Sequence, residues 1–171
     1  MSPQLYFFVS VGFSLVAWGI VTARYVWPRL RDRQQVDALR PLLILHSFRF
    51  EGLAFLVPGV VSPDLPAAFA HSAAYGDFIA ATLALLTLAW LSLSPRTGVA
   101  IAWIFNLWGT ADLLNAFYQG NASGLAFGQL GATYFIPTVF VPLLLITHVL
   151  AFRILLQRAD QSVVTASPRP A

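Results

Sequence analysis

The sequence predicts an all-α, polytopic membrane protein with five transmembrane helices in one bundle. Three observations support this fold class. Of the 171 residues, 58% are hydrophobic and 10% are charged, with a mean hydropathy of +0.72, whereas a soluble domain carries about a quarter charged residues. Five apolar stretches are long enough to cross a bilayer core, which takes about 20 helical residues. Basic residues occur at alternate connections between these stretches, as the positive-inside rule requires.

The five transmembrane helices are expected at residues 5–27, 41–61, 67–93, 98–117 and 125–155, within a transmembrane domain of residues 1–158. Stretches rich in Pro, Gly, Asn and Asp separate them, and these residues favour turns. The third and fifth helices are longer than a crossing needs, so we expect them to tilt. Pro137 and Pro142 should bend the fifth helix. Residues 159–171 are small and polar with two prolines, which predicts a short disordered cytoplasmic tail.

The distribution of arginine predicts the orientation of the bundle. Basic residues flank the first and third connections and follow the fifth helix, at Arg24, Arg29, Arg31, Arg33, Arg40, Arg96, Arg153 and Arg158. The second and fourth connections carry none, so the N-terminus is expected outside and the C-terminus in the cytoplasm. No basic residue precedes the first apolar stretch, which is the reverse of a secretory signal. Short loops and an arginine-only basic set favour a bacterial-type inner membrane as the location.

The missing residue types exclude several kinds of chemistry. The chain has no cysteine, which rules out disulfides, thiolate metal sites, iron–sulfur clusters and c-type haem attachment. It also has no lysine, and therefore no side-chain amine for a Schiff base. The net charge of +3 is interpreted as a topology signal and does not indicate nucleic-acid binding. We expect no cofactor and no metal site. The expected partner is the lipid bilayer, with a homo-oligomer or another membrane subunit left open.

Polar residues inside the apolar stretches are the candidate functional residues. A helical rise of 1.5 Å per residue places four of them in one layer, roughly 12–15 Å from the cytoplasmic edge: Arg49, Glu51, Asp77 and Asn106. Six others lie closer to the outside and are expected to wall an outward-opening polar pocket: His71, Tyr75, Asp112, Asn115, Gln129 and Tyr134. His46 and His148 are placed toward the cytoplasm.

Arg49 needs an anionic partner, because an unpaired cation inside the membrane costs at least a few kcal/mol. Asp77 is the candidate, since its depth matches and alanines surround it on its helix. An Arg49–Asp77 contact would hold the second predicted helix against the third. Glu51 and Asp112 then have no obvious cation. They are protonated, they face water in a cavity, or they bind something positive.

Four functions remain open at this stage. The first is binding or moving a small molecule, ion or proton through the outward-opening pocket, and the second is an accessory or structural subunit without chemistry of its own. The third is a membrane enzyme acting on a lipid or isoprenoid, for which Glu51 and Asp112 would be the acid–base groups, although no catalytic motif accompanies them. The fourth is a b-type haem protein, but its axial ligands must face each other, and His46 and His148 are expected at different depths. Whether the chain is an enzyme is therefore left undecided.

Overall fold

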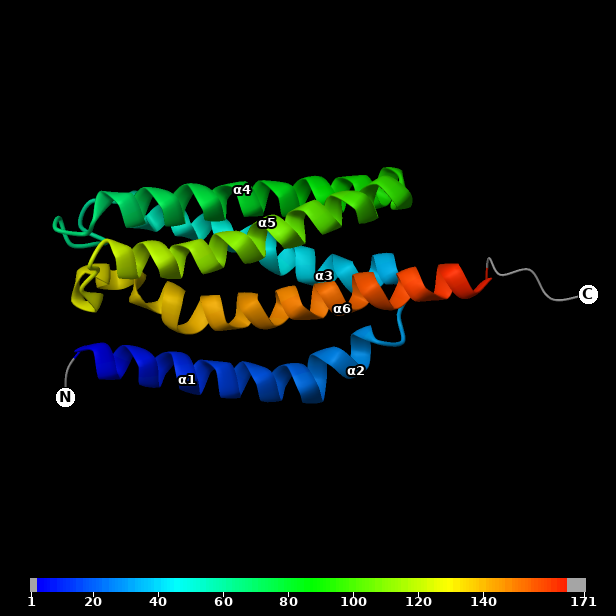
Figure 1. Ribbon diagram of the computed structural model, residues 1–171, viewed down its shortest axis with the longest axis horizontal. Helices are drawn as coiled ribbons and strands as arrows, with labels where there is room; N and C mark the ends of the chain where they lie inside the picture. The colour runs from blue at the N-terminus through cyan, green and yellow to red at the C-terminus, as the bar shows by residue number, and fades with distance from the viewer. Residues whose placement is uncertain (1–2, 166–171) are drawn as a thin grey trace, which may run out of the picture.

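The protein is described by a computed structural model, which covers residues 3–165 and the side chains of residues 3–156. Its named elements are all helices, so the all-α prediction is confirmed. Long helices lie side by side along one axis, and successive long segments run in opposite directions (Figure 1). α1 begins at one end of this bundle, called the N-terminal end below, and α6 finishes at the other, called the C-terminal end.

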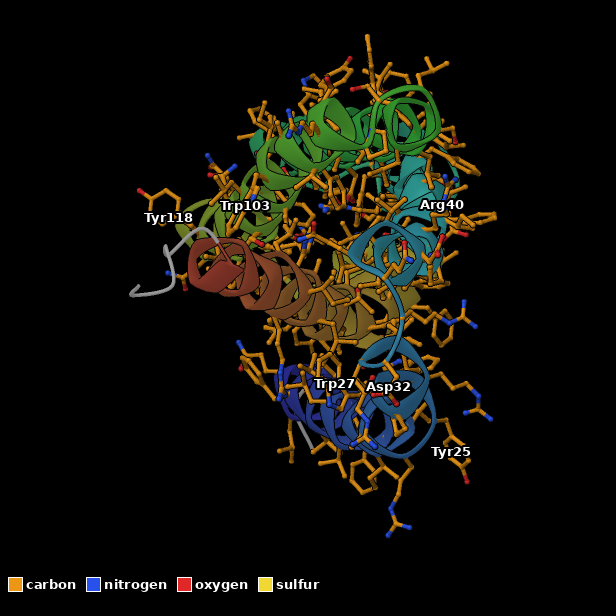
Figure 2. All side chains as sticks on the ribbon, turned by 90° about the vertical axis from the view of Figure 1, so that its right-hand side faces the viewer. Tyr25, Trp27, Asp32, Arg40, Trp103 and Tyr118 are labelled. Atoms are coloured by element: carbon orange, nitrogen blue, oxygen red, sulfur yellow. The ribbon has the colours of Figure 1, made fainter. Side chains whose placement is uncertain are left out.

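The first predicted transmembrane helix is a rod with a local defect. It comprises α1 (Pro3–Val21), the single π-helical turn η1 (Thr22–Val26) and α2 (Trp27–Leu30). Pro28 has no backbone N–H and cannot complete the α-helical pattern, and the chain widens into the π turn just before it, where the Trp27 N–H bonds to the Thr22 carbonyl. The rod lies at the edge of the bundle against α6, with Tyr25 pointing away (Figure 2). The Arg153 guanidinium carbon of α6 lies 4.1 Å from the Trp27 ring centre, a cation–π contact.

The second predicted helix is shorter and of mixed type. The α-helix α3 covers Gln35–Ser47, and the chain continues as the 3₁₀-helix η2, Phe48–Leu56. Every third residue of η2, namely Arg49, Gly52 and Phe55, is buried. A 3₁₀-helix has three residues per turn, so these three residues form one face, which packs against the rest of the bundle. The prediction of an α-helix over 41–61 is therefore wrong in type and in both boundaries.

The third and fourth predicted helices form a tight hairpin. α4 covers Ala67–Leu93, as predicted, and α5 covers Pro95–Ala122, which is longer than the predicted 98–117. Ser94 alone joins them. Small residues let the two backbones approach: the buried positions of α4 include Ala70, Ala73, Ala74, Gly76, Ala80, Ala81 and Ala84.

The fifth predicted helix is broken near its start. Residues 127–134 form the 3₁₀-helix η3 (Phe127–Tyr134), which Gly131 interrupts with φ 54° and ψ −133°. The π turn η4 (Ile136–Phe140) and α6 (Val141–Thr165) follow. η3 is held against the connection after η2, because the Ala132 N–H donates to the Val60 carbonyl at 2.8 Å. α6 continues to Thr165, into the expected tail, whose residues 166–171 lie outside the described part of the chain.

Among the residues that the structure describes, four helices rather than five are long and apolar enough to cross a membrane: Pro3–Leu30, Ala67–Leu93, Pro95–Ala122 and Ile136–Leu156. The segment α3–η2 is not one of them because its α-helix has 13 residues. It nevertheless runs along the bundle, between the end where α2 finishes and the end where α4 begins (Figure 1). The chain is thus a multi-pass membrane protein with four helices suited to crossing the bilayer.

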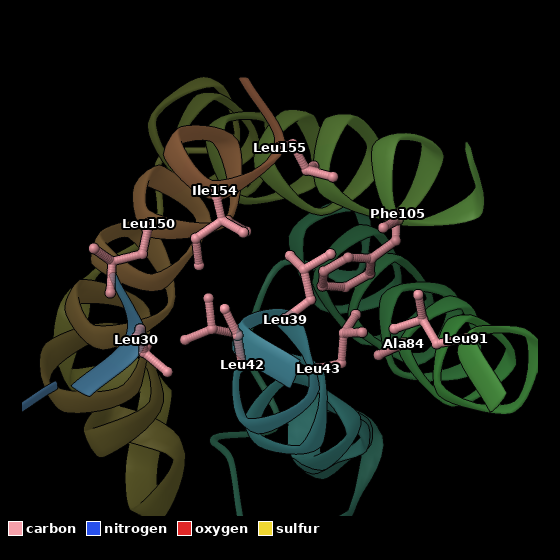
Figure 3. Close-up of a cluster of buried hydrophobic side chains, with 13 residues drawn as sticks. Leu30, Leu39, Leu42, Leu43, Ala84, Leu91, Phe105, Leu150, Ile154 and Leu155 are labelled. Atoms are coloured by element: carbon pink, nitrogen blue, oxygen red, sulfur yellow. The ribbon is translucent and has the colours of Figure 1, made fainter. Parts of the chain in front are cut away.

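A polar layer separates the two largest of the three buried apolar clusters in the described part of the chain. One cluster joins α3 to α4, α5 and α6, with Leu39 and Leu43 beside Phe105 (Figure 3). The other lies toward the N-terminal end of the bundle and includes Phe7, Phe55 and Phe69. Seven of the eleven buried polar side chains of residues 3–156 lie between them along the chain: His46, Arg49, Asp77, Asn106, Asp112, Thr147 and His148.

Candidate functional site

Arg49 is the centre of the buried polar layer and is only 3% exposed. Its Nε donates to Asp77 Oδ1 on α4 at 2.7 Å, and its Nη2 donates to Asp112 Oδ2 on α5 at 2.7 Å. The first contact is the pair predicted from the sequence. The second supplies Asp112 with the cation that the sequence did not identify. The rigid guanidinium fork can serve two carboxylates at once, so one side chain joins η2, α4 and α5.

The third nitrogen of Arg49 determines which ring nitrogen of His148 carries the proton. Arg49 Nη1 donates to the Gly109 carbonyl at 3.2 Å and lies 3.3 Å from His148 Nε2. Guanidinium nitrogens only donate, so Nε2 must be the acceptor and the ring proton lies on Nδ1. That nitrogen then donates to Asn106 Oδ1 at 2.6 Å, while Asn106 Nδ2 donates to the His148 carbonyl at 3.3 Å. His148 is therefore a neutral ring, and the network extends to α6.

Three glycines make room for this network. A Cβ atom at Gly52 would collide with the Asp77 carboxylate, and one at Gly76 would collide with the Asp112 carboxylate. A Cβ atom at Gly109 would lie 2.5 Å from His148 Cε1 and 2.8 Å from Arg49 Nη1. Each glycine therefore brings a neighbouring backbone close to a charged or hydrogen-bonding group.

His46 contacts His148 directly, with ring centres 4.2 Å apart. The prediction that these two histidines lie at different depths is therefore wrong. His46 Nε2 lies 3.0 Å from Thr147 Oγ1, and its buried Nδ1 has no hydrogen-bond partner among the described residues. Axial haem ligands must lie on opposite faces of the porphyrin, and two imidazoles in contact leave no space for one. Over residues 3–156, no three His, Cys, Asp or Glu side chains are grouped to hold a metal ion.

Glu51 lies near the network without joining it. Its side chain is partly exposed, and it makes no hydrogen bond or ion pair with any described side chain or backbone group. It lines a small cavity of about 30 Å³ together with Arg49 and Asp77. Of the four residues predicted in the midplane layer, the structure thus connects Arg49, Asp77 and Asn106, the last through His148.

The residues predicted to form an outer pocket are dispersed. His71 and Tyr75 are exposed on α4 and contact each other edge to face, with ring centres 5.9 Å apart. Asn115 Nδ2 donates to Ser72 Oγ at 2.8 Å on an exposed part of the α4–α5 hairpin. His71, Tyr75 and Asn115 therefore contact neighbouring side chains and do not line a common cavity.

Gln129 and Tyr134 instead hold η3 in place. Gln129 Nε2 donates to the Asp64 carbonyl at 3.0 Å, and its Oε1 accepts from the Ala126 N–H at 3.0 Å. The Tyr134 hydroxyl lies 3.2 Å from Ser10 Oγ on α1. Of the six predicted pocket residues, only Asp112 borders the large cavity of the structure.

That cavity has a volume of about 630 Å³ and lies toward the N-terminal end of the bundle. Its walls come from α1, η2, α4, α5, η3, η4 and the start of α6, and are mostly apolar: Phe7, Phe8, Phe55, Phe69, Ala73, Leu113, Ala116, Phe117, Leu125, Phe127, Leu130, Ile136 and Val141 are among them. Asp77 and Asp112 are the lining residues furthest along α4 and α5 from that end, so the cavity ends at the arginine network.

This cavity could not be predicted from the sequence. Its aromatic residues have the same pattern as side chains that face lipid, and they come from seven elements whose rotations relative to each other are set by packing. The one available signal was Asp112, a carboxylate inside an apolar stretch with no assigned cation. Asp112 was expected in a polar pocket, whereas the cavity beside it is mostly apolar.

The comparisons with known proteins support a family assignment. The family described as Domain of unknown function (DUF8737) matches residues 6–156. No curated protein and no solved structure matches the chain. The matched segment contains all residues of the arginine network and all those lining the cavity except Gln4. Because the match covers most of the 171 residues, the chain belongs to the DUF8737 family.

Proposed function

We propose that the chain crosses the bilayer five times. We also propose that it binds a small hydrophobic molecule with a polar end, in the cavity that Asp77 and Asp112 line. Support for the fifth crossing comes from connectivity. α2 ends at one end of the bundle and α4 begins at the other (Figure 1), so if both neighbours cross the membrane, α3–η2 must cross too. Its 13 α-helical and nine 3₁₀ residues extend over about 37 Å, enough for a bilayer core of about 30 Å.

The arginine distribution supports the orientation. Apart from Arg49, the basic residues up to Arg158 lie in or beside the connection between α2 and α3, at the start of α5 and in the later part of α6. These regions lie at the end of the bundle where α2 finishes (Figure 1). By the positive-inside rule this end faces the cytoplasm. The cavity lies toward the opposite end and is therefore proposed to receive its ligand from outside or from the outer half of the bilayer.

The observation that carries the proposal is the cavity itself. Protein interiors are close-packed, and an apolar space of about 630 Å³ has the size of a small-molecule site. Such sites are lined mainly by apolar and aromatic side chains with a few convergent polar groups. Here the polar groups are two carboxylates at one end, which would orient a ligand with its polar group toward Arg49 and its apolar body among the phenylalanines.

The proposal is tested by filling the cavity. Ala116 on α5 lines it, and Ala116→Phe would occupy part of its volume without removing a hydrogen bond. Ala111 is exposed on the same helix and does not line the cavity, so Ala111→Phe is the matched control. Binding of three probes with a common naphthyl body and an ethyl alcohol, ethylamine or acetic acid side chain would be measured by native mass spectrometry from mild detergent.

We expect at least one probe to bind the wild-type protein and the Ala111→Phe variant equally. Ala116→Phe should weaken that binding by about tenfold or more, equivalent to about 1.4 kcal/mol. Failure of all three probes to bind, or equal binding to Ala116→Phe, would contradict the proposal. A lipid that stays bound and that Ala116→Phe displaces would identify the ligand as a lipid and support the proposal.

A further inference from the structure

We infer that the ligand of this cavity is a lipophilic cation, a small apolar molecule with an ammonium or amidinium group that binds to Asp77 and Asp112 from the cavity side. This inference rests on the proposed function and specifies the chemical class of the ligand. It depends on the charge of the site, on the hydrogen-bonding capacity that the site leaves unused, and on the apolar surroundings of the two carboxylates.

The charge of the site does not balance. Two carboxylates, Asp77 and Asp112, share the single guanidinium of Arg49, which is the one cation that either aspartate contacts among the described residues. His148 does not compensate, because its Nε2 accepts from Arg49 and the ring is neutral. Glu51, beside Arg49 and Asp77, adds a further carboxylate. With both aspartates ionised, Arg49, Asp77 and Asp112 together carry one excess negative charge, before Glu51 is counted.

An excess charge inside a membrane protein is costly, so the site must take up a proton or a cation. A proton can fulfil this requirement when the cavity holds no charged ligand. The adjoining volume of about 630 Å³ also gives access to a far larger cation. Electrostatic attraction is stronger beside apolar walls than in bulk water, because the effective dielectric constant is lower.

The unused hydrogen-bonding capacity matches an ammonium group. Asp77 uses Oδ1 and Asp112 uses Oδ2 to accept from Arg49. Asp77 Oδ2 packs beside Gly52 and Asp112 Oδ1 packs beside Gly76, and neither oxygen accepts a hydrogen bond from any described group. The two aspartates are only 7% and 9% exposed, and both line the cavity. Carboxylates only accept, so the complementary ligand is a donor. An ammonium offers up to three N–H donors and a positive charge, whereas an alcohol offers one donor and a carboxylate ligand would be repelled.

The walls of the cavity fit the apolar part of such a molecule. Phe7 and Phe127 are stacked with ring centres 3.9 Å apart, and Phe55 and Phe69 meet edge to face at 5.4 Å. These rings offer flat apolar surface, and their faces also attract cations. A hydrophilic cation would gain nothing from most of this surface, so the site should discriminate against small inorganic cations.

The test compares naphthylethylamine, naphthylethanol and naphthylacetic acid on the wild-type protein, Asp112→Asn and the control Asp64→Asn. Asp64 is exposed in the connection before α4 and does not line the cavity, so Asp64→Asn removes one negative charge at the same end of the bundle. Wild-type protein and Asp64→Asn should bind the amine about tenfold or more tightly than the alcohol, with the acid weakest. In Asp112→Asn, Arg49 and Asp77 balance each other, so the amine and the alcohol should bind within about threefold.

The outcomes separate the two proposals. Equal binding of amine and alcohol to the wild-type protein, with both weakened by Ala116→Phe, would overturn the cation inference and leave the proposed function standing. No binding of any probe would overturn both. An amine preference that survives in Asp112→Asn and in Asp77→Asn would also contradict the inference. If either variant fails to fold, as judged by thermal unfolding, the wild-type comparison of the three probes decides alone.

Discussion

Arg49 illustrates how a charge becomes stable inside an apolar bundle. Its guanidinium has a partner for each nitrogen: Asp77 for Nε, Asp112 for Nη2, and the Gly109 carbonyl with His148 for Nη1. Burying ions is costly, and only good geometry with additional hydrogen bonds offsets the cost. The network therefore selects one arrangement of η2, α4, α5 and α6, because its hydrogen bonds form only when these four elements meet. Its contribution to the net free energy of unfolding is smaller.

Removing the arginine should leave two carboxylates facing each other without a cation. We predict that Arg49→Leu destabilises the fold by about 3–5 kcal/mol, as breaking a buried ion pair from one side does. Thermal unfolding in a fixed detergent would measure the effect. Adding Asp77→Asn and Asp112→Asn to Arg49→Leu should recover much of the loss, because no uncompensated charge then remains. If the triple variant were as unstable as Arg49→Leu, packing of the arginine would be more important than charge.

A second prediction at this scale concerns the close approach of α4 and α5. Gly76→Ala should lower stability by about 1–3 kcal/mol, because the added methyl group collides with the Asp112 carboxylate and must displace it from Arg49. Gly12→Ala in α1 is the control, since a Cβ there meets nothing within 4 Å. Thermal unfolding of both variants would check this, and equal midpoints would contradict it.

At the scale of elements, the positions of the helical regions could be predicted from the sequence more accurately than the type of each helix. The α4 boundaries were predicted as found, because Pro66 and Ser94–Pro95 delimit a long apolar stretch that contains no proline. η2 was missed, since a 3₁₀-helix and an α-helix have similar composition and differ in which residues share a face. The expected continuous helix over 125–155 was wrong because Gly131 has a positive φ that interrupts η3, and the chain passes through the π turn η4 before α6 begins.

Gly131 provides the test of that explanation. Its φ of 54° is unfavourable for residues with a Cβ, and a Cβ would also collide with the Val60 carbonyl. We predict that Gly131→Ala costs about 1–2 kcal/mol or more in thermal unfolding. Gly128→Ala in the same 3₁₀-helix should be neutral within about 0.5 kcal/mol, because its surroundings are open. An equally mild effect at both positions would contradict the strained turn.

At the scale of the whole molecule, the number of crossings can be tested by chemical labelling. The chain has no cysteine, so single substitutions label without background. If α3–η2 crosses the membrane, Asp32→Cys and Asp64→Cys lie on opposite sides of it, since they flank this segment. We predict that a membrane-impermeant maleimide added to intact cells labels Asp64→Cys and leaves Asp32→Cys unlabelled until the cells are opened.

Thr97→Cys, exposed at the start of α5, serves as the control and should behave as Asp32→Cys does. Labelling of both Asp32→Cys and Asp64→Cys from the same side would show that α3–η2 does not cross. Labelling of Asp32→Cys alone from outside would reverse the proposed orientation and move the cavity to the cytoplasmic side.

The amino-acid sequence alone determined the class of this protein. Transfer of apolar side chains into a bilayer depends on composition and length, and both are properties of a linear stretch. It also indicated the contact between Arg49 and Asp77, because a buried cation must find an anion at similar depth. These inferences needed no knowledge of how one helix is rotated against another.

The tertiary structure decided which residues meet. Asp112 joined the arginine because Gly76 lets α4 approach α5 closely. His148 met His46 because η3 and η4 break the chain before α6, so the depth of His148 differs from that in one continuous helix. Such departures from a uniform rise of 1.5 Å accumulate along each segment and shift side chains past one another. The cavity depends on seven elements at once, so only their packing could define it.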